Sequence, residues 1–164
     1  MTKQSKKPAS LPYVALLLAW LVPGAGHAYL GRWARGIIIF VTISGLFWTG
    51  IAVGGVMTVD YRNERYWFLA EMFAGVHGLV GWYRQRAVYQ RLDISEFDTS
   101  AESDEKLDRA GLALVAPSET VARAYSGIAG LLNVMCMFDA LMLSVMGVFG
   151  EKPAPKGKAE SKAA

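Results

Sequence analysis

The sequence contains one cysteine, Cys136, so no disulfide bond can form within the chain. It also lacks the short motifs of several common enzyme classes. His-Glu-x-x-His, Gly-x-Ser-x-Gly, the phosphate-binding loop and Cys-x-x-Cys are all missing. These absences exclude the hydrolases and oxidoreductases that depend on those motifs. We therefore expect a protein that is not an enzyme, with no cofactor and no metal site.

Charged residues are also scarce. They make up 19% of the chain, and 53% of its residues are apolar, whereas soluble domains have about 25% charged residues. The charges gather at both ends, in short turns and between residues 84 and 123. The lysines of the two ends supply most of the net charge of +3, a pattern typical of segments that contact anionic head groups. We expect a lipid bilayer as partner and no nucleic acid.

Four segments are apolar enough to predict membrane helices, which need about 20 residues each. They are 11–27, 36–57, 66–83 and 124–149. Bilayer-spanning backbone must satisfy its own hydrogen bonds, which favours helix. The sequence therefore predicts an all-α integral membrane bundle of four transmembrane helices.

The first of these segments is the weakest. Leu11 to Val22 covers about 18 Å as a helix, less than a hydrocarbon core of about 30 Å. One alternative has three spans and a re-entrant first segment, and another is a cleaved signal peptide. The distribution of Lys and Arg is nearly even for four spans and favours a cytoplasmic N-terminus for three.

The chain divides by composition into a basic tail, an apolar region, a polar region, a last helix and a second basic tail. The expected boundaries are a basic cytoplasmic tail 1–10, three apolar helices in 11–83 that include a hairpin over 11–57, a polar and partly flexible loop 84–117, a final transmembrane helix 118–149 and a disordered Lys-rich tail 150–164.

A glycine-rich stretch, "PGAGHAYLGRWARG", separates the first two apolar segments. It resembles the hairpin of the two-transmembrane-helix domain family. The matching residues are Gly24, Gly26, His27, Tyr29, Leu30, Gly31 and Gly36. The later stretch "IAGLLNVMCMFDA" is similar to the last helix of a family of uncharacterised small multi-pass bacterial membrane proteins. The resemblance implies a multi-pass protein of the bacterial inner membrane and no known activity.

The physical role of the hairpin can be argued without the family. Pro23 has no N–H and leaves the Ala19 carbonyl without its helical donor, and His27 is a candidate to hydrogen-bond a freed carbonyl. Arg32 and Arg35 can reach head-group phosphates. A packed membrane turn and a binding role for His27 both remain open.

Four polar residues lie inside the apolar segments: Glu71, His77, Asn133 and Asp139. Because such residues are costly in a bilayer, they should face the bundle interior and find partners there. One interpretation is interhelical hydrogen bonding in a structural or partner-binding membrane module. The alternative is a proton or cation pathway that uses Glu71, His77 and Asp139. Under either interpretation, the expected partners include another membrane protein or a second copy of the chain.

Overall fold

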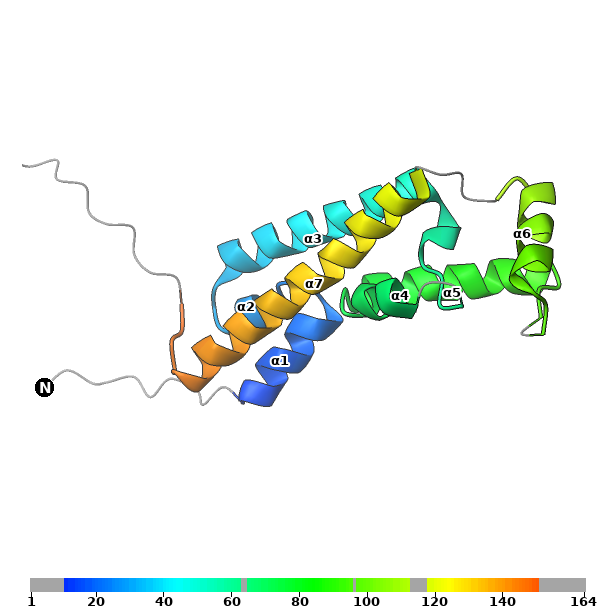
Figure 1. Cartoon of the computed structure of the whole chain (residues 1–164). Helices are drawn as coiled ribbons and strands as arrows, with labels where there is room; N and C mark the ends of the chain where they lie inside the picture. The colour runs from blue at the N-terminus through cyan, green and yellow to red at the C-terminus, as the bar shows by residue number, and fades with distance from the viewer. Residues whose placement is uncertain (1–10, 63–64, 96, 113–117, 151–164) are drawn as a thin grey trace, which may run out of the picture.

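The computed structural model describes residues 11–62, 65–95, 97–112 and 118–150 (Figure 1). These residues form helices and connecting turns and contain no strand, which confirms the predicted all-α class. In chain order the elements are α1 (Pro12–Leu21), α2 (Ala25–Tyr29), α3 (Trp33–Gly54), a 3-10 turn η1 (Val56–Thr58), α4 (Arg65–Met72), α5 (Val76–Arg91), α6 (Ser100–Arg109) and α7 (Ser118–Val145).

Two antiparallel helices, α3 and α7, form the long axis of the molecule and pack side by side (Figure 1). They have 22 and 28 residues, so each exceeds a hydrocarbon core of about 30 Å. Among the described residues, these are the two helices long and apolar enough to cross a membrane. Ile43 and Phe47 of α3 and Ala129 of α7 are buried in the cluster that this packing creates.

The other two predicted spans are each broken into short helices, so four spans are not confirmed. Helix α1 has 10 residues and ends at Leu21, because Pro23 cannot donate a helical hydrogen bond and Gly24 has a φ of +84°. The third segment breaks between α4 and α5 at Gly75, whose φ is +66°. L-residues with a side chain rarely adopt such values.

The two breaks meet at one side chain of α7, Asn133. Its Nδ2 group donates to the Ala19 carbonyl at 3.1 Å and to the Phe73 carbonyl at 2.9 Å. The first is the carbonyl that Pro23 leaves without a donor. The second lies in the break between α4 and α5, where the regular helical pattern is interrupted. Asn133 is fully buried. Its amide group therefore connects both interrupted segments to α7 by hydrogen bonds inside the molecule.

Glycines let the backbones approach closely around these breaks. A Cβ at Gly75 would collide with the Trp20 carbonyl oxygen, and a Cβ at Gly130 would collide with the Ala70 carbonyl oxygen. On α3, a Cβ at Gly50 would come within 2.7 Å of the Ala122 carbonyl oxygen. Small residues at helix interfaces are what close packing in membranes requires.

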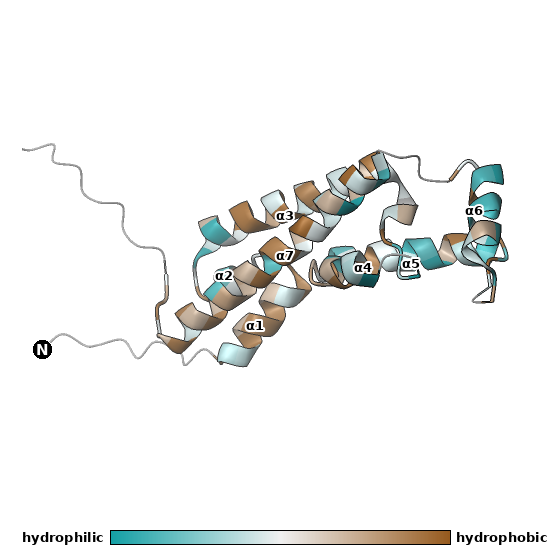
Figure 2. Ribbon diagram, viewed as in Figure 1, coloured by the Kyte–Doolittle hydropathy of each residue, from teal (hydrophilic) through white to brown (hydrophobic). Residues whose placement is uncertain are grey.

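The polar end of the molecule is a folded head made of η1, the second half of α5, and α6. Met57, Tyr89, Ile94 and Leu107 form a small buried cluster within it. Figure 2 shows that hydrophilic residues gather on α6 and the adjoining end of α5, whereas α1, α3 and α7 are largely hydrophobic. The structure therefore places a polar unit at one end of an apolar helix bundle.

The Asn133 contact can be tested by its removal. We expect Asn133→Ala to lower the free energy of unfolding in detergent by about 1–3 kcal/mol, because two buried carbonyls lose their donor. Cys136→Ala, one turn further along α7 and half-buried, removes a comparable volume and serves as the control. Equal stability of the two variants in denaturant titrations would contradict the assigned role.

The close packing of α7 against α4 makes a second prediction. Gly130→Ala should lower the free energy of unfolding by about 1–3 kcal/mol, the usual cost of overpacking, because the backbone of α4 must move. Gly45→Ala is the matched control, since a Cβ at Gly45 meets no atom within 4 Å. Thermal unfolding should separate the two variants, and a Gly130→Ala protein as stable as Gly45→Ala would show that the approach is looser than described.

Candidate functional site

A side-chain hydrogen bond ties the hairpin between the first two apolar segments to the last helix. His27 on α2 contacts Asp139 on α7, with Nε2 and Oδ2 2.9 Å apart. The histidine is 1% exposed, whereas the Asp139 side chain is 51% exposed. His27 therefore does not bond a freed carbonyl, as considered from the sequence. The Ala19 carbonyl accepts from Asn133, and His27 bonds the Asp139 side chain instead.

The glycines of the hairpin bring its two arms together. A Cβ at Gly24 would collide with the carbonyl of Gly36 at the start of α3, and a Cβ at Gly26 would come within 2.5 Å of the Ala15 carbonyl oxygen. Gly31 has a φ of +78°. The predicted packed turn is thus present, with Pro23 buried within it and Tyr29 exposed.

The two arginines of the hairpin lie at the start of α3. Arg35 is 59% exposed and its Nη1 is 3.6 Å from Asp139 Oδ2, a distance at which an exposed pair contributes little stability. Arg32 is only 5% exposed. Both line a cavity of about 570 Å³ between the start of α3 and the end of α7. Its apolar wall is formed by Ala34, Ile38, Leu143, Met146 and Val148.

The remaining predicted polar residues lie at separate helix contacts. Glu71 on α4 is fully buried and accepts a hydrogen bond from the Ser126 hydroxyl of α7. His77 on α5 is hydrogen-bonded through Nε2 to the Ser44 hydroxyl of α3, 2.8 Å away. The structure thus gives Glu71, His77 and Asp139 three different partners. In the described segments, no group of three or more His, Cys, Asp or Glu residues is arranged to hold a metal.

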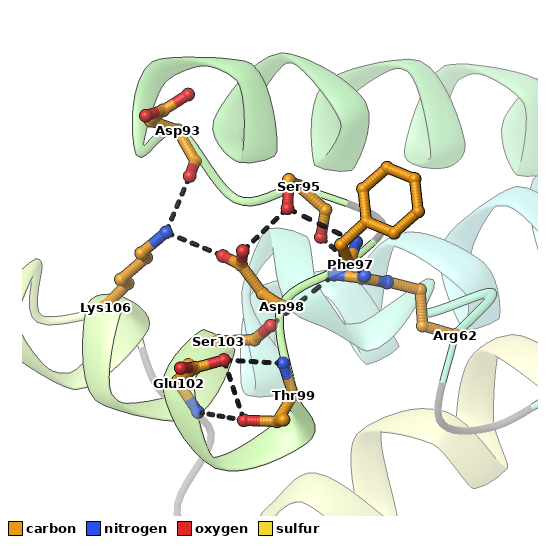
Figure 3. Close-up of polar contacts among 9 residues, drawn as sticks. All are labelled: Arg62, Asp93, Ser95, Phe97, Asp98, Thr99, Glu102, Ser103 and Lys106. Carbon is orange, nitrogen blue, oxygen red and sulfur yellow. Dashed lines mark hydrogen bonds and ion pairs between the residues drawn. The ribbon is translucent and has the colours of Figure 1, made fainter.

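A polar cluster in the head was not found from the sequence (Figure 3). Lys106 on α6 donates to Asp98 Oδ2 at 2.6 Å and to the Asp93 carbonyl at 2.7 Å. Ser95 donates to Asp98 Oδ1 at 2.6 Å. Arg62, from the turn after η1, donates to the Ser95 carbonyl at 2.6 Å. These bonds join α6, the segment between α5 and α6, and the turn after η1.

A local sequence pattern indicates where α6 starts. Thr99 and Glu102 form a reciprocal capping box, in which each side chain bonds the backbone N–H of the other residue. The spacing Thr-x-x-Glu is the usual pattern of such a box. By contrast, nothing local indicates that Asp60 is buried and accepts a hydrogen bond from Gln85 Nε2 at 3.1 Å.

Beside this cluster lies a cavity of about 430 Å³ at the polar end of the molecule. It is lined by Tyr61, Arg62, Arg65, Tyr89, Asp98, Ser100 and Ser103. The Lys106 and Ser95 hydrogen bonds lower the pKa of Asp98 to about 2, so this carboxylate is charged at neutral pH. Burial and the nearby Asp60 charge raise the pKa of Tyr89 well above its usual range.

The Asp98 contact predicts a pH dependence. Because its pKa falls from 3.8 to about 2 on folding, Asp98 stabilises the head above about pH 4 and loses this effect as pH drops towards 2. Lys106→Gln should raise the Asp98 pKa towards 3.8, measured by the carboxyl carbon shift in NMR. Arg109→Gln, which removes the exposed pair with Glu105, should leave it near 2. An Asp98 pKa unchanged by Lys106→Gln would show that the ion pair does not form.

Comparison with known proteins places the chain in one family. No curated protein and no solved structure matches it. The resemblance to the two-transmembrane-helix domain family is not tested by these comparisons and stays a prediction. A family described as "Family of unknown function (DUF6677)" matches residues 14–153, which include the hairpin, the head and α7. The chain therefore belongs to DUF6677, a family of unknown function.

Proposed function

We propose that this protein is a non-enzymatic membrane module that presents its folded head to a protein partner. The observation that carries the proposal is the head itself. In it a buried apolar cluster joins α6 to α5 and η1, and the Lys106 contacts tie α6 to the segment that follows α5. Ordering this polar segment costs conformational entropy. The outcome is a rigid surface at one end of two apolar helices.

The outer faces of the long helices support membrane insertion. Only 22% of the most apolar window of α3 and 33% of that of α7 are buried inside the molecule, so most of these residues need an apolar environment outside it. The large exposed side chains include Ile37, Ile38 and Val41 on α3 and Met135, Phe138 and Met142 on α7. Lipid chains would cover them.

The membrane arrangement follows from these two helices. We propose that α3 and α7 cross the bilayer while α1 and α4 pack against them, in a multi-pass protein of the bacterial inner membrane. The start of α3 and the end of α7 lie at the same end of the molecule, opposite the head (Figure 1). With a cytoplasmic N-terminus, the head would face the other side of the membrane.

The partner surface is best defined by Phe97 and the adjacent cavity. Phe97 is 96% exposed, and Figure 3 shows its ring directed away from the Asp98 cluster. Arg62, Arg65 and two tyrosines line the cavity. Exposed aromatic and arginine side chains are the residue types that dominate protein interfaces. We propose a partner segment that offers an apolar site for Phe97 and a carboxylate for Arg65.

A proton or cation pathway has less structural support. Glu71, His77 and Asp139 contact Ser126, Ser44 and His27, respectively, and these contacts lie on different helix pairs. Such bonds fit a role in fixing helix register. A relay would need a chain of exchangeable groups between the three residues, and no such chain is seen among the described residues.

Site-specific photocrosslinking tests the proposed surface. A benzophenone amino acid at Phe97 should yield one discrete protein adduct in native membranes, whereas the same group at Tyr83, which is 71% exposed on α5, should not. Arg65→Glu should abolish the Phe97 adduct by charge repulsion, and Arg84→Glu should not. An adduct with a second copy of the chain would identify the partner as a homo-oligomer.

The opposite results would overturn the proposal. These are lipid adducts alone at Phe97, or a protein adduct that is equally strong at Phe97 and Tyr83. Persistence of the adduct in Arg65→Glu would rule out the acidic partner segment while leaving the aromatic contact in place.

A further inference from the structure

The cavity at the start of α3 contains a buried cation, Arg32, for which no ion pair is seen among the residues that the structure describes. Arg32 is 5% exposed, and its Nε atom is buried and makes no hydrogen bond within the described residues. Asp139, the carboxylate at this end of α7, is instead engaged by His27 and Arg35. A buried guanidinium is costly unless an anion compensates it, so this side chain points to a ligand of negative charge.

The backbone holds Arg32 in place. Its N–H donates to the His27 carbonyl at 2.9 Å, and its own carbonyl accepts from Gly36 N–H at 2.9 Å. Arg35 lies one helical turn further on and lines the same cavity. The start of the 22-residue helix α3 adds the partial positive charge of a helix N-terminus. Guanidinium groups at a helix start favour phosphate, which they bind in a fork geometry.

The opposite wall of the cavity is apolar. Ile38 comes from α3, Leu143 lies on α7, and Met146 and Val148 follow the end of α7. Ile38 and Met146 are largely exposed at 64% and 61%. A free phosphate ester would leave this wall uncovered, whereas an acyl chain would cover it. The cavity thus combines a cationic end with a hydrophobic side.

The position of the cavity along α3 corresponds to the level of the lipid head groups in a membrane. Trp33, at the start of α3, is 66% exposed, and Tyr29 before it is 42% exposed. Exposed Trp and Tyr side chains at the end of an apolar helix mark the membrane–water interface. Arg32 and Arg35 lie in the same stretch of chain, where phosphates of the bilayer are found.

We propose that Arg32 and Arg35 form a specific site for the phosphate of an anionic phospholipid, whose acyl chain packs on Ile38, Leu143 and Met146. This site is separate from the partner surface of the head and does not depend on it. It differs from general attraction of the lysine-rich ends to the membrane surface, because one lipid is held by two defined side chains.

Native mass spectrometry of the delipidated full chain in a neutral detergent tests the site. We expect dioleoylphosphatidylglycerol to bind one per chain at least about tenfold more tightly than dioleoylphosphatidylcholine, because the choline cation of the second lipid would lie beside two guanidinium groups and be repelled by them. Arg35→Gln should weaken phosphatidylglycerol binding about tenfold. Arg84→Gln, the same change on an exposed residue of α5, should have no effect. The terminal lysines are present in every variant.

Arg32→Gln should abolish selective binding, and Arg32→Lys should restore it only in part because the fork is lost. If Arg32→Gln fails to fold, the decision rests on Arg35→Gln and Met146→Glu, whose side chains are largely exposed. Both should lose selective binding in a folded protein.

Three results would overturn the proposal. Equal binding of the two lipids would show that no anion site exists. An unchanged affinity of Arg35→Gln for phosphatidylglycerol would show that lipid binding does not use the cavity. Displacement of phosphatidylglycerol by equimolar glycerol phosphate would identify the occupant as a soluble phosphate ester rather than a lipid.

Discussion

The fold depends on one buried amide. Asn133 donates hydrogen bonds to the Ala19 and Phe73 carbonyls, each of which lies at a point where a helix is interrupted. In an apolar environment an unsatisfied carbonyl is expensive, so the breaks can persist only where a donor reaches them. Helix α7 supplies that donor and also provides the surface against which α1, α3 and α4 pack.

The same helix organises both ends of the molecule. Near its start, Ser126 holds Glu71 of α4, and near its end Asp139 holds His27 of the hairpin. Between them, Gly130 allows the backbone of α4 to approach closely. Polar contacts therefore alternate with small residues along α7. This pattern fixes the register of the broken segments, and it positions the head at one end and the arginine-lined cavity at the other.

The sequence predicted the helical class, the two long apolar helices and the polar residues that would need partners. It also indicated the break at Pro23, because proline removes a donor wherever it stands in a helix. The break at Gly75 was not predicted, since glycine is common in membrane helices and its positive φ depends on contact with α1. The pairing of His27 with Asp139 spans 112 residues, and no local pattern indicates which long-range partner a buried histidine takes.

The head contains more helix than its composition indicates. Residues 84–117 were expected to form a polar, partly flexible loop, and within this range α5 continues to Arg91 and α6 begins with a capping box. Charged residues do not prevent order when they pair with one another, as Lys106 does with Asp98. Residues 96 and 113–117 of the expected loop lie outside the described residues, as do the expected basic tail 1–10 and residues 151–164 of the expected Lys-rich tail.

The central claim is that the Asn133 amide contacts both interrupted helices at once, and solid-state NMR can measure this directly. Protein labelled with ¹⁵N only at asparagine side-chain nitrogen and with ¹³C at the carbonyls of either alanine or phenylalanine would be reconstituted in bilayers. The account predicts strong ¹³C-dependent dephasing of the Asn133 Nδ2 signal in both samples, because one carbonyl of each type accepts a hydrogen bond from it. Dephasing in neither sample, or in only one, would contradict the claim that a single amide fastens both breaks.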